Sequence, residues 1–143
     1  MEFLFMKRFF SFLATAALAI FFTNHASAQQ HHDKVLIDLS EYEEKVFSQN
    51  GEDGVIGKIF NLIEATQKYY VEFGVSDGLE CNTRLLREKH GWNGLSMDGG
   101  FSNPEINLQR HFITAENINS LFDMYHVPFD FDLLSIDLDY NDF

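Results

Sequence analysis

The sequence is poor in cysteine, in clustered positive charge and in long apolar runs. Cys81 is its one cysteine, so no disulfide can form within the chain. Its 10 Lys and Arg residues stand against 22 Asp and Glu residues, which gives a formal charge of −12. Because phosphate binding needs clustered basic side chains, we expect no nucleic-acid partner.

The longest apolar run, residues 9–22, is shorter than the roughly 20 residues that cross a bilayer comfortably. Two basic residues precede this run and Ala26-Ser-Ala28 follows it, which is the pattern of a signal peptide. We therefore predict a signal peptide over residues 1–28, a leader segment over residues 29–46, and a secreted or periplasmic protein with no stable membrane span after cleavage. Without cleavage, the run would anchor the chain to a membrane.

The stretch Tyr69–Gly78 carries the strongest functional signal. Residues 69–73 are β-branched and aromatic, as in a buried strand, and a loop with glycines four residues apart follows. A strand that feeds a glycine turn and then a helix presents backbone N–H groups to nucleotide-like ligands in doubly wound α/β domains. An ordinary buried strand with a glycine turn is the alternative.

The spacing in this stretch is Glu-x-Gly-x-x-x-Gly, so the dinucleotide fingerprint Gly-x-Gly-x-x-Gly is absent. We expect a nucleoside-type ligand, with S-adenosylmethionine as the favoured cofactor. The candidate cofactor-binding residues of the strand and loop are Glu72, Gly74, Ser76, Asp77 and Gly78.

A second acidic position follows at a typical distance. Residues 82–89 are predicted to form a helix, and residues 92–98 a short strand that ends in Asp98. An acid about 20 residues beyond the glycine turn binds ribose hydroxyls in this architecture, and a carboxylate can accept from both hydroxyls. Alternatively, Asp98 forms a turn before Gly99-Gly100.

The next segments give weaker candidates. Residues 111–115 are predicted to form a third strand, and residues 118–125 a helix. Residues just after a third strand commonly line an adenine pocket, which makes Glu116 and Asn117 candidate cofactor contacts. Equally, Thr114 or Asn117 caps the helix.

The last predicted strand, residues 133–136, ends among acids that include Asp137 and Asp139. Ligands of open α/β sheets lie outside the carboxyl ends of the strands. The acids could orient a substrate or act as a base, hold a divalent metal, or begin a calcium loop.

Another acidic stretch precedes an apolar stripe at helical spacing. Ser48 or Asn50 would cap this helix, with Glu52 and Asp53 in its first turn. In the functional alternative, Gln49, Glu52 and Asp53 reach into the ligand cleft.

Five segments in this order resemble the FkbM-like, class I S-adenosylmethionine-dependent methyltransferases. The segments are Ser48-Gln-Asn-Gly-Glu-Asp-Gly-Val-Ile56, Val71-Glu-Phe-Gly-Val-Ser-Asp-Gly78, Asn82-Thr-Arg84, Gly91-Trp-Asn-Gly-Leu95 and Asp132-Leu-Leu-Ser-Ile-Asp-Leu-Asp139. The resemblance implies an α/β, Rossmann-like, doubly wound and mostly parallel sheet. It also implies methyl transfer to a hydroxyl of a small molecule or glycan.

By position, the resemblance places Glu72, Gly74 and Gly78 in the cofactor loop and Asp98 at the ribose. It places Asp137 at the methyl group or the acceptor, and we take Asp139 beside it as a second candidate catalytic acid. The reaction mostly requires alignment of acceptor, methyl and sulfur, with a base for the acceptor proton.

A complete domain of this class has more strands than the four predicted here. We therefore expect residues 47–143 to be the N-terminal part of a domain truncated after the fourth strand, which is inactive as a fragment or completed by another copy. The alternatives are an exported non-catalytic binding module and a nucleotide-sugar glycosyltransferase, in which Asp137-Leu-Asp139 would bind a metal.

Overall fold

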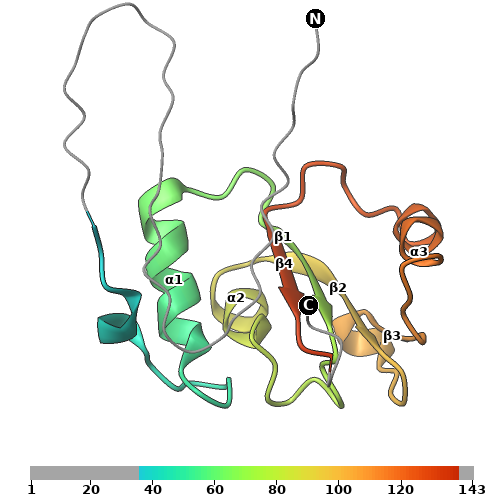
Figure 1. Cartoon of the computed structure of the whole chain (residues 1–143), viewed down its shortest axis with the longest axis horizontal. Helices are drawn as coiled ribbons and strands as arrows, with labels where there is room; N and C mark the ends of the chain where they lie inside the picture. Colours follow the sequence, from blue (N-terminus) through green and yellow to red (C-terminus); the bar gives the residue numbers. More distant parts are fainter. Residues whose placement is uncertain (1–35, 139–143) are drawn as a thin grey trace, which may run out of the picture.

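A parallel four-stranded sheet with helices on both faces forms the centre of the molecule, and its strand order is β3-β2-β1-β4 (Figure 1). The computed structural model describes residues 36–138, so the predicted signal peptide and Asp139 lie outside the described residues. The strands are β1 (Tyr69–Phe73), β2 (Asn93–Asp98), β3 (Leu108–Arg110) and β4 (Leu133–Ile136). The helices are α1 (Glu52–Ile63), α2 (Arg84–Lys89) and α3 (Ile118–Met124), with short 3-10 turns η1 (Leu39–Tyr42) and η2 (Pro104–Ile106). The expected α/β, Rossmann-like fold with four parallel strands is confirmed.

Strand β1 divides the core into two layers because its side chains alternate between the faces of the sheet. Tyr70 packs with Ile56 of α1 and Leu86 of α2, whereas Val71 packs with Leu121 of α3. Figure 1 accordingly shows α1 and α2 on one side of the strands and α3 on the other. All three pairs of neighbouring strands are parallel, which places their carboxyl ends at one edge of the sheet.

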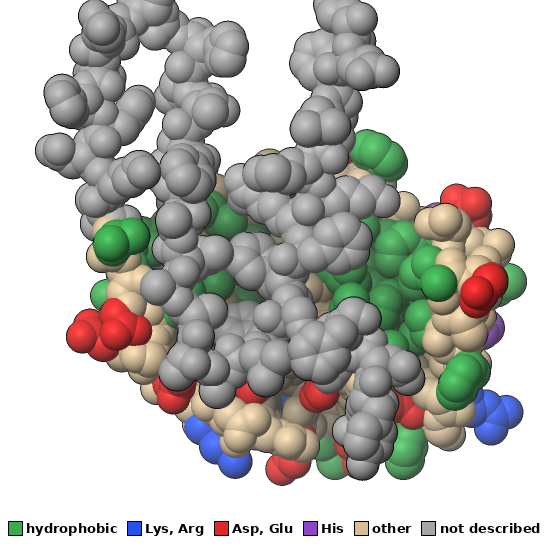
Figure 2. Space-filling model, in the orientation of Figure 1, with side chains coloured by type: hydrophobic (Ala, Val, Ile, Leu, Met, Phe, Trp, Pro, Cys, Tyr) green, Lys and Arg blue, Asp and Glu red, His purple; other side chains and the backbone are tan. Residues whose placement is uncertain are grey.

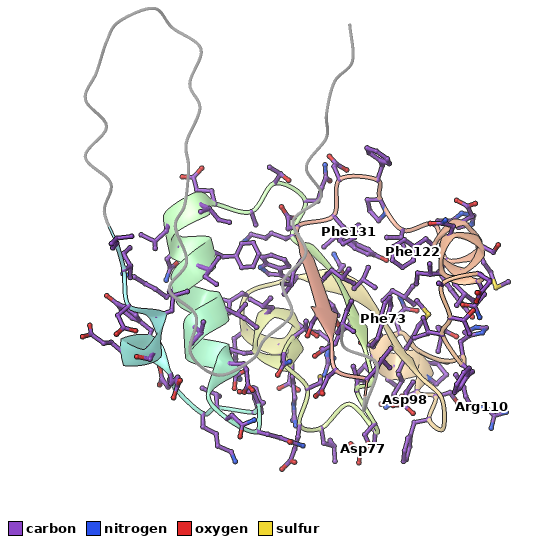
Figure 3. The ribbon with its side chains drawn as sticks, viewed as in Figure 1. Phe73, Asp77, Asp98, Arg110, Phe122 and Phe131 are labelled. Carbon is purple, nitrogen blue, oxygen red and sulfur yellow. The ribbon has the colours of Figure 1, made fainter. Side chains whose placement is uncertain are left out.

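Aromatic side chains close the α3 side of the sheet. Phe122 of α3 lies between Phe73 and Phe131, with ring centroids 6.3 and 5.8 Å apart (Figure 3). Figure 2 shows hydrophobic side chains gathered beside α3 and acidic side chains along the rim at the carboxyl ends of the strands. The apolar volume expected from 16 Phe residues is thus partly used to cover the sheet.

The third strand is where the sequence prediction is wrong. It was expected over residues 111–115, but β3 covers Leu108–Arg110. Asn107 adopts φ +52° and its side chain donates to the Gly94 carbonyl at 2.7 Å, which turns the chain from η2 into line with β2. Leu108 is then fully buried, while Phe112 is 80% exposed and has left the sheet.

Asp132, just before β4, links the beginning of β4 to the segment before β1, at the amino ends of the strands. Its carboxylate accepts from the Thr66 N–H at 2.7 Å, the Thr66 hydroxyl at 2.8 Å and the Gln67 N–H at 2.9 Å. Partial burial raises the pKa of this carboxyl, but the combined hydrogen bonds outweigh burial and hold the pKa below its ordinary value of 3.8.

We expect Asp132→Asn to lower the free energy of unfolding at neutral pH by about 1–2 kcal/mol, because it weakens these hydrogen bonds. Because the pKa of Asp132 is lowered on folding, its ionised form stabilises the folded state above pH 3.8. This stabilisation is lost as the pH falls through the pKa of Asp132 in the folded state. Urea denaturation of both proteins over acid to neutral pH measures the difference. A difference that grows on acidification would contradict the assignment.

Candidate functional site

The candidate site lies at the carboxyl edge of the sheet, where the chain changes direction. From β1 the chain builds β2 and β3 on one side, and then returns to place β4 on the other side of β1. This arrangement makes the carboxyl ends of β1 and β4 the topological switch point, where open α/β sheets bind ligands. Residues 74–78, which we call the glycine loop, leave β1 at this point, and Figure 3 shows Asp77 and Asp98 at the same edge.

Gly74 begins the glycine loop in close contact with β4. A Cβ at this position would lie 1.7 Å from the Asp137 carbonyl oxygen, and φ is +74°. The Gly74 N–H also donates to the Met97 carbonyl of β2 at 2.9 Å, and the Asp137 N–H donates to the Phe73 carbonyl at 3.1 Å. Gly74 thus holds the ends of three strands together, which only a residue without a side chain permits here.

Asp98 joins the glycine loop to the end of β2. Its Oδ2 accepts from the Ser76 N–H at 2.8 Å, and its Oδ1 accepts from the Gly100 N–H at 2.7 Å and the Phe101 N–H at 3.2 Å. The turn-forming role of Asp98 is therefore confirmed. The same carboxylate also reaches the glycine loop, so the acid at the end of β2 and the loop after β1 lie side by side, while ribose binding stays a prediction.

The remaining loop residues shape the turn. Ser76 has φ +52° and Gly78 φ +81°, and a Cβ on Gly78 would meet the Ile106 side chain at 2.5 Å. Asp77 is exposed, and its carboxylate accepts from the Leu79 N–H at 3.0 Å. Close packing of the loop against η2 therefore depends on glycine at position 78.

Glu72 is placed beneath the loop rather than at its surface. Its side chain is 1% exposed and accepts from the Asn82 N–H at 2.8 Å, the Thr83 N–H at 3.1 Å, the Thr83 hydroxyl at 2.5 Å and the Ser135 hydroxyl at 3.2 Å. Burial raises the pKa of Glu72, although all of these donors favour the charged form. Glu72 therefore positions the start of α2 and ties it to β4.

The helix predicted over residues 82–89 begins two residues later, at Arg84. Thr83 occupies the cap position, and Asn82 donates instead through its side chain to the Ser135 hydroxyl at 3.2 Å. Beside this network, burial and the nearby Glu72 charge raise the pKa of Cys81 to about 11. Its thiol consequently stays protonated at neutral pH and is unsuited to nucleophilic chemistry.

The residues proposed for an adenine pocket make local hydrogen bonds. The Asn117 side chain accepts from the Thr114 N–H and donates to the Phe112 carbonyl, both at 2.8 Å, and the Thr114 hydroxyl accepts from the Asn117 N–H at 3.3 Å. Glu116 is exposed, and a hydrogen bond from the Thr114 hydroxyl lowers its pKa. Asn117 occupies the cap position of α3 as the alternative proposed, but its side chain bonds to residues before the helix and not to the first turn. A cofactor contact of Glu116 or Asn117 stays a prediction.

Among the acids before and within α1, Asp53 is buried and Glu52 is not. The Asp53 Oδ2 accepts from the N–H groups of Val46, Phe47 and Ser48, and the Ser48 hydroxyl accepts from the Asp53 N–H at 3.2 Å. Glu52 accepts from the Asn50 N–H at 2.9 Å. The capping interpretation therefore applies to Ser48, although Gly51 is the residue directly before the helix.

The chemistry of this edge is dominated by carboxylate oxygens. Asp77 and Asp137 are exposed there, with Asp98 half-buried between the loops.

Within residues 36–138, no group of three His, Cys, Asp or Glu side chains is arranged to hold a metal ion. None of the helices in this part of the chain has the length and apolarity needed to cross a membrane. Comparisons with protein-family models, curated proteins and solved structures find no match to this chain.

Proposed function

We propose that this chain is an S-adenosylmethionine-binding domain of the FkbM-like methyltransferase type. The observation that supports the proposal best is the hydrogen bond between Asp98 and Ser76, because it joins an acid at the end of β2 to the glycine loop after β1. The pair lies beside the switch point between β1 and β4, and an acid at the end of the second strand is the position that binds ribose in nucleoside-binding α/β domains. The five sequence segments that resemble the family support the same proposal.

The donor set around Asp98 fits one ribose hydroxyl directly. A carboxylate offers about four lone-pair sites, and three backbone N–H groups use three of them. One hydroxyl can therefore be accepted without breaking a hydrogen bond. A second hydroxyl would compete with the Ser76 N–H, so ligand binding is expected to shift the glycine loop.

The charge of the edge also suits this cofactor. S-adenosylmethionine supplies an electrophilic methyl group on a positively charged sulfur, and the exposed carboxylates of Asp77 and Asp137 favour a cation at this edge. In the proposed reaction, Asp137 orients the acceptor hydroxyl and receives its proton, and the glycine loop and Asp98 hold the nucleoside. Asp139 remains a candidate for the same proton transfer.

Isothermal titration with S-adenosylhomocysteine tests the proposal. We expect binding by the wild-type chain and at least about tenfold weaker binding by Asp98→Asn, because the variant loses the charge-assisted hydrogen bond to the ribose. Asp123→Asn, which removes an exposed carboxylate on α3, is the matched control and should bind as the wild type does. Thermal unfolding of each variant tests whether the fold is kept.

Three outcomes would overturn the proposal: no binding by the folded wild type, equal binding by Asp98→Asn, or binding of a sugar nucleotide with Mn²⁺ instead. The third outcome would favour the glycosyltransferase alternative. The first, without sugar-nucleotide binding, would favour the non-catalytic module.

A further inference from the structure

Residues 43–51, which we call the strap, cross from η1 to α1 and include the first four residues of the segment Ser48–Ile56, to which the proposed function assigns no ligand contact. Asp53 holds the strap in place, since a single oxygen of this buried side chain accepts from three consecutive strap N–H groups at 2.7–3.0 Å. The strap therefore has a defined conformation and is not merely a connection.

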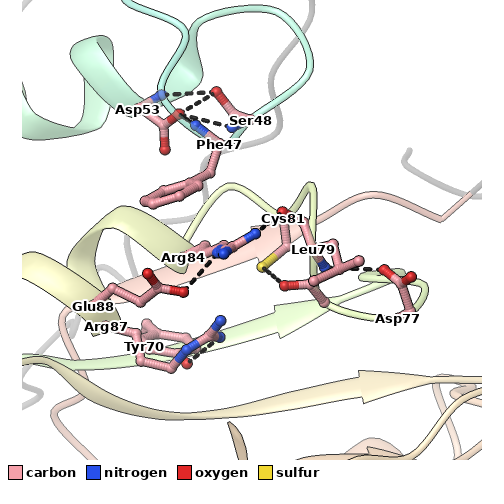
Figure 4. Close-up of polar contacts among 11 residues, drawn as sticks. Phe47, Ser48, Asp53, Tyr70, Asp77, Leu79, Cys81, Arg84, Arg87 and Glu88 are labelled. Atoms are coloured by element: carbon pink, nitrogen blue, oxygen red, sulfur yellow. Dashed lines mark hydrogen bonds and ion pairs between the residues drawn. The ribbon is translucent and has the colours of Figure 1, made fainter.

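Arg84 links the strap to the segment that continues the glycine loop. Its guanidinium carbon lies 4.1 Å from the centre of the Phe47 ring, and its Nη1 donates to the Leu79 carbonyl at 2.7 Å. Its Nε forms an ion pair with Glu88 of α2 at 2.7 Å, as Figure 4 shows. The planar guanidinium is suited to this task because it can stack on a ring and donate in its own plane at the same time.

A second contact follows the same path. The Gln49 side chain of the strap donates to the Glu80 carboxylate at 3.4 Å. Leu79 in turn donates its N–H to Asp77, inside the glycine loop. Strap, Arg84 and glycine loop thus form a continuous chain of contacts from Asp53 to Asp77.

We infer that Arg84 is a positioning residue that couples the conformation of the strap to that of the glycine loop. While Asp53 accepts from the strap N–H groups, the Phe47 ring stays in contact with the Arg84 guanidinium. The guanidinium in turn donates to the Leu79 carbonyl, directly after the glycine loop. The consequence for cofactor affinity rests on the proposed function, whereas the coupling itself does not.

A double-mutant cycle read by amide hydrogen exchange tests the coupling without any ligand. The variants are Phe47→Leu, which keeps an apolar side chain but removes the ring, Arg84→Ala, and their combination. We expect Arg84→Ala to speed exchange of the Leu79 and Gly78 amides about tenfold, and Phe47→Leu to speed it several-fold. The double variant should exchange no faster than Arg84→Ala, because both changes break the same link.

Two control variants separate this coupling from general loosening. Glu88→Gln removes the ion pair of Arg84 but leaves its contacts with Phe47 and Leu79. Lys58→Ala removes a cation–π contact in which the Lys58 Nζ lies 4.4 Å from the centre of the Tyr42 ring in η1. This contact does not involve the glycine loop. Both should leave exchange of the Leu79 amide unchanged. Arg84→Lys, which keeps the charge without the planar fork, should fall between Arg84→Ala and the wild type.

Multiplicative effects of the two substitutions, or unchanged loop exchange in Arg84→Ala, would overturn the inference. If Arg84→Ala does not fold, the same cycle with Arg84→Lys decides. If the wild type binds S-adenosylhomocysteine, Phe47→Leu should weaken that binding several-fold, although Phe47 lies in the strap. If the wild type does not bind S-adenosylhomocysteine, the proposed function is refuted. The coupling between the strap and the glycine loop is then tested by the hydrogen-exchange measurement alone.

Discussion

Glu72→Leu is expected to lower the free energy of unfolding by about 3–5 kcal/mol, because it leaves a group of buried donors without an acceptor. The Asn82 and Thr83 N–H groups and the hydroxyls of Thr83 and Ser135 all bond to this carboxylate. Relief from burying a charge offsets part of the loss. Urea denaturation monitored by circular dichroism measures the change.

Glu72→Gln is the control that keeps the shape of the side chain. Its amide oxygen still accepts, but its NH₂ group faces donors, so we expect a smaller loss of about 1–2 kcal/mol at neutral pH. The pKa of Glu72 is raised on folding, so the folded state binds its proton more tightly than the unfolded state. The stability of the wild type relative to this variant should therefore fall as the pH rises from 4.5 towards neutrality. A relative gain over that range would mean that the hydrogen bonds outweigh burial and lower the pKa of Glu72 instead.

Local sequence patterns were sufficient to predict most of the sheet. Residues 69–73 were read correctly as a strand, the strand ending in Asp98 began one residue later than expected, and the helix after Asn117 ended one residue earlier. In each case a run of apolar residues is bounded by a polar or glycine turn that also ends the element. The boundaries of such elements can therefore be predicted from the local sequence.

The third strand could not be found this way. β3 has one inward-facing apolar residue, Leu108, and its place beside β2 depends on the left-handed turn at Asn107. The run His111–Ala115 looks more like a strand in sequence, yet it carries the exposed Phe112. An edge strand needs little apolar surface, so tertiary pairing rather than composition selected it.

The sequence predicts where the candidate site lies but not which hydrogen bonds and contacts each of its residues makes. Gly74, Gly78 and Asp98 were found from spacing, and the structure brings them to one edge. The same spacing could not show that Glu72 is turned toward α2, because strand alternation gives a side but not the donors that meet it there. The contact of Arg84 with the strap joins residues far apart in sequence, and no local pattern signals it.

Asp98 and Glu72 illustrate two uses of a carboxylate at the end of a strand. Glu72 accepts two backbone N–H groups and Asp98 three, but Glu72 is 1% exposed while Asp98 remains half-buried at the rim. Only the rim carboxylate can exchange one of its chain donors for a ligand hydroxyl without opening the core. Substitutions of Glu72 should therefore act on stability first, whereas substitutions of Asp98 should act on binding.

Gly74→Ala should be the most damaging of the glycine-to-alanine substitutions in residues 36–138. The added Cβ would lie 1.7 Å from the Asp137 carbonyl oxygen, a rigid backbone atom that also belongs to the switch point. In addition, φ of +74° disfavours any residue with a side chain. We expect a loss of at least about 3 kcal/mol, through separation of β4 from β1 at their carboxyl ends.

Gly57→Ala is the matched control, since it adds the same methyl group to the chain. Gly57 lies within α1, and a Cβ there meets nothing within 4 Å. Alanine should therefore stabilise the fold by about 0.5–1 kcal/mol through its higher helix propensity. Thermal and urea unfolding of the two variants, side by side, should give changes of opposite sign. If Gly74→Ala unfolds as the wild type does, then β1 and β4 do not approach each other at this glycine, and the candidate site loses the contact that closes its switch point.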